Sequence, residues 1–524
     1  MKKLLLSAVA ATVFAGTAAV LAQQAAPPAG APAATPAAPA AAAGRGGRGP
    51  NPQQLMFTSR CATCHGTDLQ GARAPSLFNH ALLNQRTDDQ LRKIILEGDS
   101  AVDMPAFKDT LSVDEVNQLI TFLRVQGGNM RPLPVFTIDP NGQVLKTQKQ
   151  NVRVEVVAAG LDTPFGMSFL PDGRLVISER SGFIRILGND GTLSERVKNT
   201  PTAWVRQDGG YFDIIAHPNY ARNGWIYLSY SELVPGYSGP MPPPGLGNAP
   251  AGFGPLPPSN TRIVRGKINA NNEWVEQQDI VKLPNELYSP PIIHYGQRFL
   301  FDGKGHLFWT LGDRGDQSNG QNLAVPMGKI HRINDDGTIP KDNPFANQQG
   351  VWPSIWTYGN RNPQGLTYDP RTGFLWESEH GPTGGDEINI IEKGKNYGWA
   401  AIADGTQPGI TGRSKPGMEN PIRSYTPSIG PSGMSFYVGN RYPGWKNSLF
   451  LTALTGNRLI RYEVKGREIL SEETIFQDYG RTRQILTGPD GLLYVLVQNP
   501  TGRGTSLGMA APSPGVVLRL QPIP

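Results

Sequence analysis

Met167-Ser-Phe-Leu-Pro-Asp-Gly-Arg-Leu-Val-Ile-Ser178 has the form of a β-hairpin, with apolar and β-branched residues on both sides of a tight turn. The same form returns in five later segments, each with Gly or Asn at its turn: 214–229, 298–311, 365–378, 434–453 and 485–497. Six repeats of one sheet unit predict an all-β six-bladed propeller over residues 151–524. The alternative is a pair of β-sandwiches, but recurrence of a single hairpin form favours the propeller.

The composition limits the functional classes. The 524 residues include 62 Gly and 47 Pro, only 18% are charged, and the formal net charge is +6. Such a chain is rich in turns and is neither collagen nor coiled coil. The charge is too mild to indicate a nucleic-acid partner.

The N-terminus predicts export. Lys2-Lys3 precedes an apolar run that ends in Val20-Leu21-Ala22, a pattern typical of a cleaved signal peptide over 1–22. An uncleaved membrane anchor is the alternative. No later segment is apolar enough to span a bilayer, so a periplasmic protein without a stable membrane span is expected. Residues 23–50 are almost entirely Ala, Pro, Gly and Gln, which predicts a disordered linker.

Residues 51–128 predict a small all-α domain, followed by a linker over 129–150. Thr87-x-x-Gln90 and Ser112-x-x-Glu115 are capping boxes, each leading into apolar residues with helical spacing. Gly127-Gly128 is expected to end the last helix.

Cys61-Ala-Thr-Cys64-His65 uses both cysteines of the chain and is the attachment signature of c-type haem. The two thiols would form thioethers, and His65 would bind the iron. The alternatives are a zinc site, for which this region offers only His80 in addition, and a redox dithiol, which needs a βαβ setting.

Met104 is the expected second iron ligand, because it precedes Pro105 in an irregular stretch between the two helices. Met56 lies too near the thioether anchor, and Met130 lies beyond the last helix. His/Met ligation raises the haem potential. Residues 51–126 resemble a class I cytochrome c, which implies electron transfer.

Three segments of the propeller carry candidate chemistry. A hairpin can bring His294 and Asp313 to one rim, where a carboxylate would orient an imidazole base. From spacing alone, however, a simple rim histidine and turn aspartate is the favoured interpretation. The segment 379–387 mixes carboxylates with Gly and Pro and is compatible with Ca²⁺. Arg481 and Arg483 lie on one face of an extended segment, a fork for carboxylates or simply a basic edge.

Taken together, these segments resemble the soluble PQQ-dependent aldose sugar and glucose dehydrogenases, also described as sorbosone dehydrogenase-like, over about 155–520. The most specific matches are Tyr358-Gly-Asn-Arg-Asn-Pro-Gln-Gly-Leu366, Glu379-His-Gly-Pro-Thr-Gly-Gly-Asp-Glu-Ile-Asn389, Asn396-Tyr-Gly-Trp399, Pro427-Ser-Ile-Gly-Pro-Ser-Gly-Met434 and Arg481-Thr-Arg-Gln-Ile-Leu-Thr-Gly-Pro-Asp-Gly491. The resemblance implies a six-bladed propeller with PQQ and Ca²⁺ at its mouth.

The resemblance also implies catalytic and PQQ-binding residues. His294 falls on the base that takes the hydroxyl proton while hydride passes to PQQ, and Asp313 falls on the carboxylate that supports it. The positions that would contact PQQ are Arg361, Asn362, Arg481 and Arg483.

The resemblance also implies two calcium sites. The carbonyls of Gly381 and Pro382 fall on those that hold a PQQ-bound Ca²⁺. Glu387 and Tyr397 fall on a second, structural Ca²⁺ site.

Two contact positions depart from the family. Thr455 stands where a PQQ-binding Lys is usual, and only Arg458 is at hand to substitute. Asp208 stands where the family has a PQQ-contacting Gln, with Gln207 one residue away. These changes predict weaker or altered PQQ binding.

The sequence therefore predicts a quinohaemoprotein that oxidises an aldose, or a related hydroxy or aldehyde compound, through PQQ. Electrons would pass to the chain's own haem c and then to a periplasmic or membrane-bound respiratory acceptor. One alternative is a cytochrome joined to a propeller that only binds carbohydrate or protein. Another is a lactonase-like Ca²⁺ hydrolase, against which the fused haem motif argues.

Overall fold

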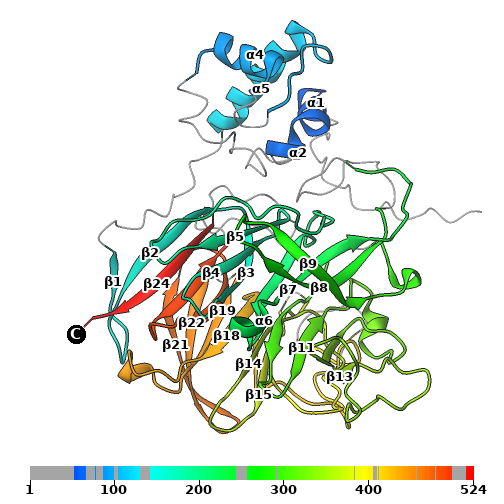
Figure 1. Ribbon diagram of the computed structural model, residues 1–524, viewed down its shortest axis with the longest axis vertical. Coiled ribbons are helices and arrows are strands. Elements are labelled where there is room, and N and C mark those ends of the chain that lie inside the picture. Colours follow the sequence, from blue (N-terminus) through cyan, green and yellow to red (C-terminus); the bar gives the residue numbers. More distant parts are fainter. Residues whose placement is uncertain are drawn as a thin grey trace, which may run out of the picture. The chain divides into compact units, whose positions relative to one another are not determined.

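The computed structural model (Figure 1) describes residues 52–65, 77, 86–99, 104–129, 142–242, 256–290, 293–382, 384–404, 410, 412–455, 457–477, 479–498 and 515–523. The predicted signal peptide and the predicted linker over 23–50 lie outside these residues. Within the described part of the chain, no helix has the length and apolar character needed to cross a membrane.

The N-terminal domain is helical, as predicted. Its helices are α1 (Pro52–Arg60), α2 (Ala62–His65), α4 (Asp88–Glu97) and α5 (Val113–Asn129). Both capping boxes form. The Thr87 hydroxyl accepts from the Gln90 amide at 3.2 Å, and the Glu115 carboxylate accepts from the Ser112 amide at 2.8 Å. The helix α5 runs to Asn129 and so includes the glycine pair that was expected to end it.

This domain has a hydrophobic core of its own. Leu91 and Ile95 of α4 pack against Val116, Leu119 and other apolar residues of α5, and all of them are buried. Phe57 of α1 is only 1% exposed and joins the same cluster. The pairing of α4 with α5 therefore buries the apolar faces that the periodicity predicted.

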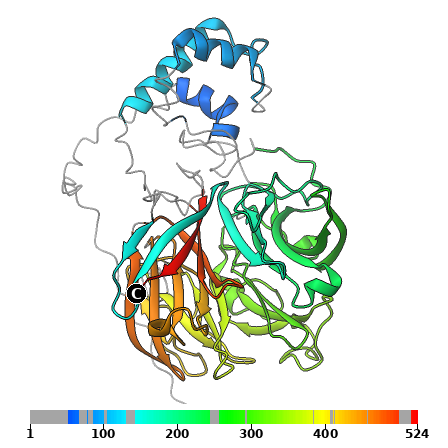
Figure 2. The same ribbon diagram turned by 60° about the vertical axis from the view of Figure 1, so that its left-hand side comes forward.

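The larger domain consists of six antiparallel sheets, which form the six blades of a propeller (Figures 1 and 2). The first blade contains β3 (Pro164–Phe169), β4 (Leu175–Glu179) and β5 (Phe183–Leu187), and the second contains β6 (Tyr211–Ala216), β7 (Ile226–Leu233), β8 (Ser259–Ile268) and β9 (Trp274–Lys282). The third contains β10 (Phe299–Phe301), β11 (His306–Leu311), β12 (Lys329–Asn334) and β13 (Ile355–Tyr358), and the fourth contains β14 (Pro363–Tyr368), β15 (Leu375–Glu379), β16 (Asp386–Ile391) and β17 (Arg423–Tyr425). The fifth contains β18 (Pro431–Phe436), β19 (Leu449–Ala453), β20 (Arg458–Lys465) and β21 (Glu468–Gln477). Each predicted hairpin is the first hairpin of one sheet, which confirms the propeller.

The sixth blade joins the two ends of the domain. It contains β22 (Thr482–Thr487), β23 (Leu493–Val497), β24 (Gly515–Pro522), β2 (Val152–Leu161) and β1 (Gln143–Leu145). The first long strand, β2, pairs with the last strand, β24, as the cyan and red ribbons of Figure 2 show. The strand β1 lies inside the segment predicted to be a linker. Because the two ends pair within one sheet, the ring of blades is closed.

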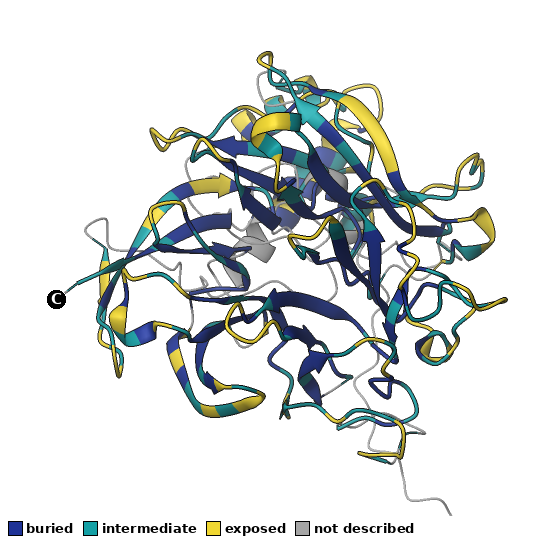
Figure 3. Ribbon diagram, turned by 60° about the horizontal axis from the view of Figure 1, so that its bottom comes forward, coloured by how far each residue is buried: buried dark blue, intermediate teal, exposed yellow. Residues whose placement is uncertain are grey.

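The core of this domain lies between neighbouring blades, where the strands are buried along most of their length (Figure 3). One cluster joins Val154 of β2, Met167 of β3, Phe450 of β19 and Val495 of β23. The nine prolines of 235–258 fall between β7 and β8, as an excursion from the second blade, although 243–255 lie outside the described residues.

Short helices and 3-10 turns occupy several connections: α6 (Tyr220–Asn223), η2 (Asn285–Leu287), η3 (Gln317–Gly320) and η4 (Pro443–Trp445). Of these, η3 bears on the candidate site, because it follows the loop that carries Asp313.

Candidate functional site

The C-x-x-C-H motif lies on the first helical segments of the small domain. The backbone amide of Cys61 donates to Phe57, and that of His65 donates to Cys61 at 3.0 Å, so the motif continues the turns of α1 into α2. Cys61 packs against the domain core, and His65 is partly exposed. This places the Cys61 thiol beside an apolar core and leaves His65 partly exposed one turn further along, an arrangement compatible with a covalently held haem.

Met104 lies on the loop that follows α4 and contacts the same core, as do Met56 and Cys61. Its backbone exchanges two hydrogen bonds with Asp99, at 2.9 and 3.0 Å. Gly98 has φ 75°, and a Cβ there would approach the Met104 carbonyl to 2.6 Å. The glycine therefore lets this loop fold back on the end of α4 and fixes Met104 against the core. The predicted rival Met130 and His80 lie outside the described residues.

In the propeller, His294 and Asp313 come together as predicted. The imidazole Nδ1 lies 2.7 Å from Asp313 Oδ1. The His294 side chain is 16% exposed and that of Asp313 is 1% exposed, so the imidazole faces outward from a buried carboxylate. His294 has φ 54°, which is uncommon for a residue other than glycine and is typical of functional sites. A Cβ at Gly312 would come within 2.3 Å of the His294 carbonyl, so only glycine permits this approach.

Asp313 is held as an anion with both oxygens used. Besides His294, its Oδ1 accepts from the Gly315 amide at 2.8 Å, and its Oδ2 accepts from the Trp399 indole at 2.7 Å. Burial alone would raise the pKa of Asp313. The hydrogen bonds from His294 and Gly315 and the charge of Arg361 outweigh burial and hold that pKa below its ordinary value of 3.8. An ionised Asp313 can fix the tautomer of His294 with the proton on Nδ1, leaving Nε2 as a base.

Arg481 and Arg483, together with Arg180, form a buried cluster of arginines. Their exposed fractions are 7%, 4% and 5%, respectively. Burial lowers the pKa of each, and Arg180 lowers the pKa of the other two further. Among the described residues, Nε of all three and Nη2 of Arg180 have no hydrogen-bond partner. Guanidinium groups stay protonated in proteins even when their pKa is lowered, so the cluster is positively charged and has donors to spare for an anion.

Asp208 is the acidic residue that acts on all three of these arginines, and its charge favours their charged forms. Its carboxylate also accepts from the backbone amide of His294 at 3.3 Å. The structure thus brings Asp208 to the junction between the arginines and the predicted base.

Arg361 and Asn362 lie on the loop between β13 and β14, in the same region. Arg361 Nη1 donates to the carbonyls of Gly381 at 2.7 Å and His380 at 3.1 Å. Asn362 accepts from the Gly296 amide at 3.0 Å and so pins the loop that carries His294. A guanidinium therefore occupies the Gly381 oxygen, one of the two carbonyls predicted to hold the PQQ-bound Ca²⁺.

A second group of polar residues fits a hard cation better. Glu377 and Glu387 lie on adjacent strands, and Asn389 donates to both carboxylates at 3.1 Å. Burial raises the pKa of Glu377 and Glu387, and the nearby charge of Glu379 raises both further. Glu377 Oε1 and Asn389 Oδ1 are buried without a hydrogen-bond partner among the described residues. Buried carboxyl and amide oxygens without a hydrogen-bond partner are suitable ligands for Ca²⁺, whose charge would favour the ionised carboxylates.

Tyr397, predicted to share this cation site, uses its hydroxyl elsewhere. The hydroxyl donates to the Ile390 carbonyl at 2.7 Å and accepts from the Glu392 amide at 2.9 Å. Only its backbone carbonyl would remain as a ligand. Across the described residues, no group of three or more His, Cys, Asp or Glu side chains is arranged as a metal site.

Thr455 stands apart from the arginine cluster. It is exposed, and its amide donates to the Ile429 carbonyl at 2.9 Å. The structure gives it no contact with Arg180, Arg481 or Arg483.

Sequence reasoning missed Arg180 and the role of Trp399. Arg180 directly follows the fully buried strand β4, and a charged residue at such a place is an available signal. Its backbone is clamped, since a Cβ at Gly210 would lie 1.9 Å from the Arg180 carbonyl. Trp399 was part of a quoted motif, but nothing in the sequence shows that its indole donates to Asp313.

Comparisons with known proteins identify the families of both domains. The family described as Glucose / Sorbosone dehydrogenase matches residues 161–507, and the family described as Cytochrome C oxidase, cbb3-type, subunit III matches residues 50–123. The chain is 36% identical to aldose sugar dehydrogenase YliI of Escherichia coli (strain K12) over 359 residues, which are 67% of this chain and 91% of that protein.

Two solved structures are also similar. The soluble aldose sugar dehydrogenase of Escherichia coli in its apo-form has a TM-score of 0.61 at 34% identity, covering 71% of this chain and all of that one (100%). The PQQ-bound form of aldose sugar dehydrogenase from Streptomyces coelicolor has a TM-score of 0.53 at 25% identity, covering 71% and 98%. The chain therefore belongs to the glucose/sorbosone dehydrogenase family and carries an N-terminal domain of the cytochrome c type.

Proposed function

We propose that this protein is an exported PQQ-dependent aldose sugar dehydrogenase that delivers its electrons to a haem c on the same chain. The observation that carries the proposal is the hydrogen bond between His294 and the buried, ionised Asp313. The same site also holds a cluster of arginines with unused donors. A PQQ-bound relative supports the choice of cofactor. The cytochrome-type domain supports an electron-transfer partner rather than a hydrolytic function.

The arginine cluster fits PQQ, which carries three carboxylates. Arg180, Arg481 and Arg483 would hold these carboxylates, because their buried N–H groups lack partners among the described residues. When bound, PQQ supplies a quinone that accepts a hydride. Arg361 lies beside the same site, and burial lowers its pKa while Asp313 and Glu379 favour its charged form.

His294 and Asp313 would remove the hydroxyl proton of the substrate. His294 Nε2 would take the hydroxyl proton as the carbon loses its hydride, because loss of hydride alone would leave a protonated carbonyl. Asp313 would stabilise the imidazolium that forms, and Trp399 and Gly315 would keep Asp313 in place. In the small domain, Cys61 and Cys64 would hold the haem, with His65 and Met104 on the iron.

Reconstitution tests the proposed function directly. The purified chain, freed of PQQ, is mixed with PQQ and Ca²⁺, and haem absorbance is followed while aldoses and simple alcohols are added. An aldose should reduce the haem only when PQQ is present. A protein that takes up PQQ but reduces neither quinone nor haem with any of these substrates would instead be a binding module.

The two buried carboxyl groups of Glu377 and Glu387 predict that the unfolding temperature of the protein depends on calcium. Since their pKa values are raised above 4.5 in the folded protein, the folded state holds protons that the unfolded state releases. Stability without metal is therefore greatest below about pH 4.5 and is lost as pH rises through the raised pKa values of these two carboxyl groups. Ca²⁺ would replace those protons, so calorimetric unfolding should show this loss in chelator and not in excess Ca²⁺.

The matched control is Glu387→Gln, which removes one of the raised carboxyl groups. In chelator, this variant should unfold at a higher temperature than the native chain near pH 8, and it should respond less to Ca²⁺. Equal unfolding temperatures of the native chain with chelator and with Ca²⁺ at that pH would rule out the cation site.

A further inference from the structure

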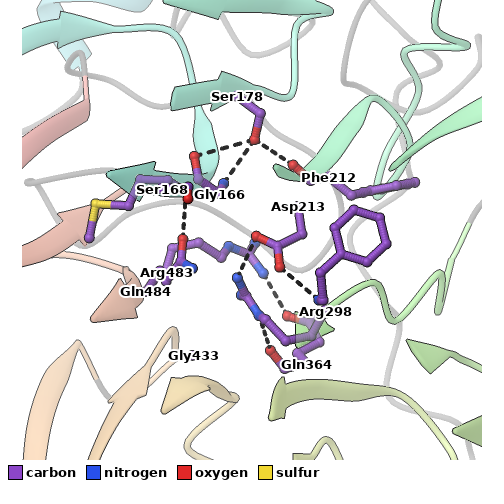
Figure 4. A network of polar contacts seen from close by, with 12 residues as sticks. Gly166, Ser168, Ser178, Phe212, Asp213, Arg298, Gln364, Gly433, Arg483 and Gln484 are labelled. Atoms are coloured by element: carbon purple, nitrogen blue, oxygen red, sulfur yellow. Dashed lines mark hydrogen bonds and ion pairs between the residues drawn. The ribbon is translucent and has the colours of Figure 1, made fainter. Parts of the chain in front are cut away.

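Two neighbouring buried arginines near the propeller axis are held in opposite ways (Figure 4). Arg298 is 3% exposed and pairs with a carboxylate, since its Nη1 lies 2.9 Å from Asp213 Oδ1. Its Nε donates to the backbone carbonyl of Gln364 at 2.8 Å. The charge of Arg298 is therefore neutralised within the protein.

Arg483 is held by neutral groups only. Its Nη1 donates to the side-chain oxygen of Gln364 at 2.6 Å, and its Nη2 donates to that of Gln498 at 2.8 Å. Its guanidinium carbon lies 4.4 Å from the centre of the Phe165 ring. Among the described residues no carboxylate pairs with it, and Asp208 acts on it only through space.

This arrangement is costly for the empty protein. Arg483 is 4% exposed, and burial lowers its pKa. The positive charges of Arg180, Arg481 and Arg298 lower that pKa further. A carboxylate in place of either amide would offset that charge and stabilise the fold. It would also occupy the guanidinium and remove the attraction for an incoming anion. Two amides, by contrast, fix the guanidinium plane without neutralising it.

We propose that Gln364 and Gln498 form an amide clamp, which orients Arg483 and leaves its charge available to a carboxylate of the bound cofactor. Gln364 would in addition link the neutralised arginine to the charged one, through its backbone carbonyl and its side chain. Gln364 and Gln498 are positioning residues, since they act through Arg483. The inference rests on the proposed function as far as the anion is PQQ.

The test replaces an amide with its isosteric acid, in the full chain. Gln364→Glu keeps the side-chain oxygen that accepts from Arg483 Nη1 and adds a negative charge at nearly the same size, so the change is chiefly one of charge. Without PQQ, the unfolding temperature should rise by about 2–4 °C. In calorimetric titration with PQQ, Kd should increase about ten- to a hundredfold. A residue with a merely structural role would not raise stability while weakening binding.

The matched control is Gln484→Glu, which adds the same charge next to Arg483 in sequence. The side-chain oxygen of Gln484 accepts from the Met167 amide at 2.6 Å and does not bind an arginine. This variant should show no rise in unfolding temperature. Gln498→Glu repeats the test on the other side of Arg483, should Gln364→Glu fail to fold.

The two opposite shifts decide the outcome. A lower unfolding temperature without PQQ in both clamp variants, or an unchanged Kd in both, overturns the amide clamp. If the native chain does not bind PQQ, the proposed cofactor is wrong, and the rise in unfolding temperature alone still shows that the two amides hold an uncompensated cation.

Discussion

His294→Gln is expected to slow substrate-driven reduction of PQQ by at least about a hundredfold, because general-base assistance contributes about 10²–10⁴-fold. Glutamine keeps a polar side chain of similar length but has no basic nitrogen, so the hydroxyl proton would have no acceptor of sufficient strength. The described contacts of the His294 side chain are to Asp313 and not to the arginine cluster, so the affinity for PQQ should be nearly unchanged. Stopped-flow absorbance of the quinone measures the rate, and titration with PQQ measures the affinity.

Two comparisons separate a lost base from a damaged fold. Reduction of the haem by dithionite should be normal in His294→Gln, since that reaction bypasses the propeller. Asp313→Asn should give a smaller loss of rate, as the base remains but its orientation is weakened and the Trp399 and Gly315 contacts persist in part. If His294→Gln with bound PQQ turns over at nearly the native rate, another residue is the base.

The blades could be predicted from the sequence because each depends on local information. A tight turn between two apolar runs, such as Pro171-Asp172-Gly173, specifies a hairpin within about a dozen residues. The closure of the ring could not be predicted. The strands β2 and β24 come from opposite ends of the domain, and no local pattern records that they pair. The short strand β1 was missed for a different reason: it has only three residues, two of them exposed, and therefore shows no strand pattern in the sequence.

The candidate site was predictable where it depends on one hairpin and less so where several blades meet. His294 and Asp313 flank the hairpin of β10 and β11, so their approach follows from the turn. Trp399 reaches Asp313 of the third blade from the connection between β16 and β17 of the fourth. Arg180 of the first blade acts on Arg483 of the sixth. Such contacts depend on the order of blades around the ring. The hydrogen bond from Arg361 to the Gly381 carbonyl is a side-chain choice that no spacing reveals.

The second large effect is expected from Cys61→Ala combined with Cys64→Ala. Thioether bonds are covalent, so the native chain should keep its haem through denaturing electrophoresis, and the double variant should lose it completely. Haem-stained gels measure this difference. Loss of haem from the denatured native chain would contradict the c-type assignment.

The same double variant separates the two halves of the proposed reaction. The core of the helical domain consists of residues between Met56 and Leu123, and none of the propeller's core clusters includes any of them. Each domain thus buries its own apolar side chains, and the propeller should fold and bind PQQ without haem. With PQQ and an aldose, the variant should still reduce an added artificial dye at close to the native rate, while the haem signal is absent. If dye reduction also disappears in a folded, PQQ-loaded variant, the haem takes part in sugar oxidation itself, and the order of electron flow from propeller to cytochrome is wrong.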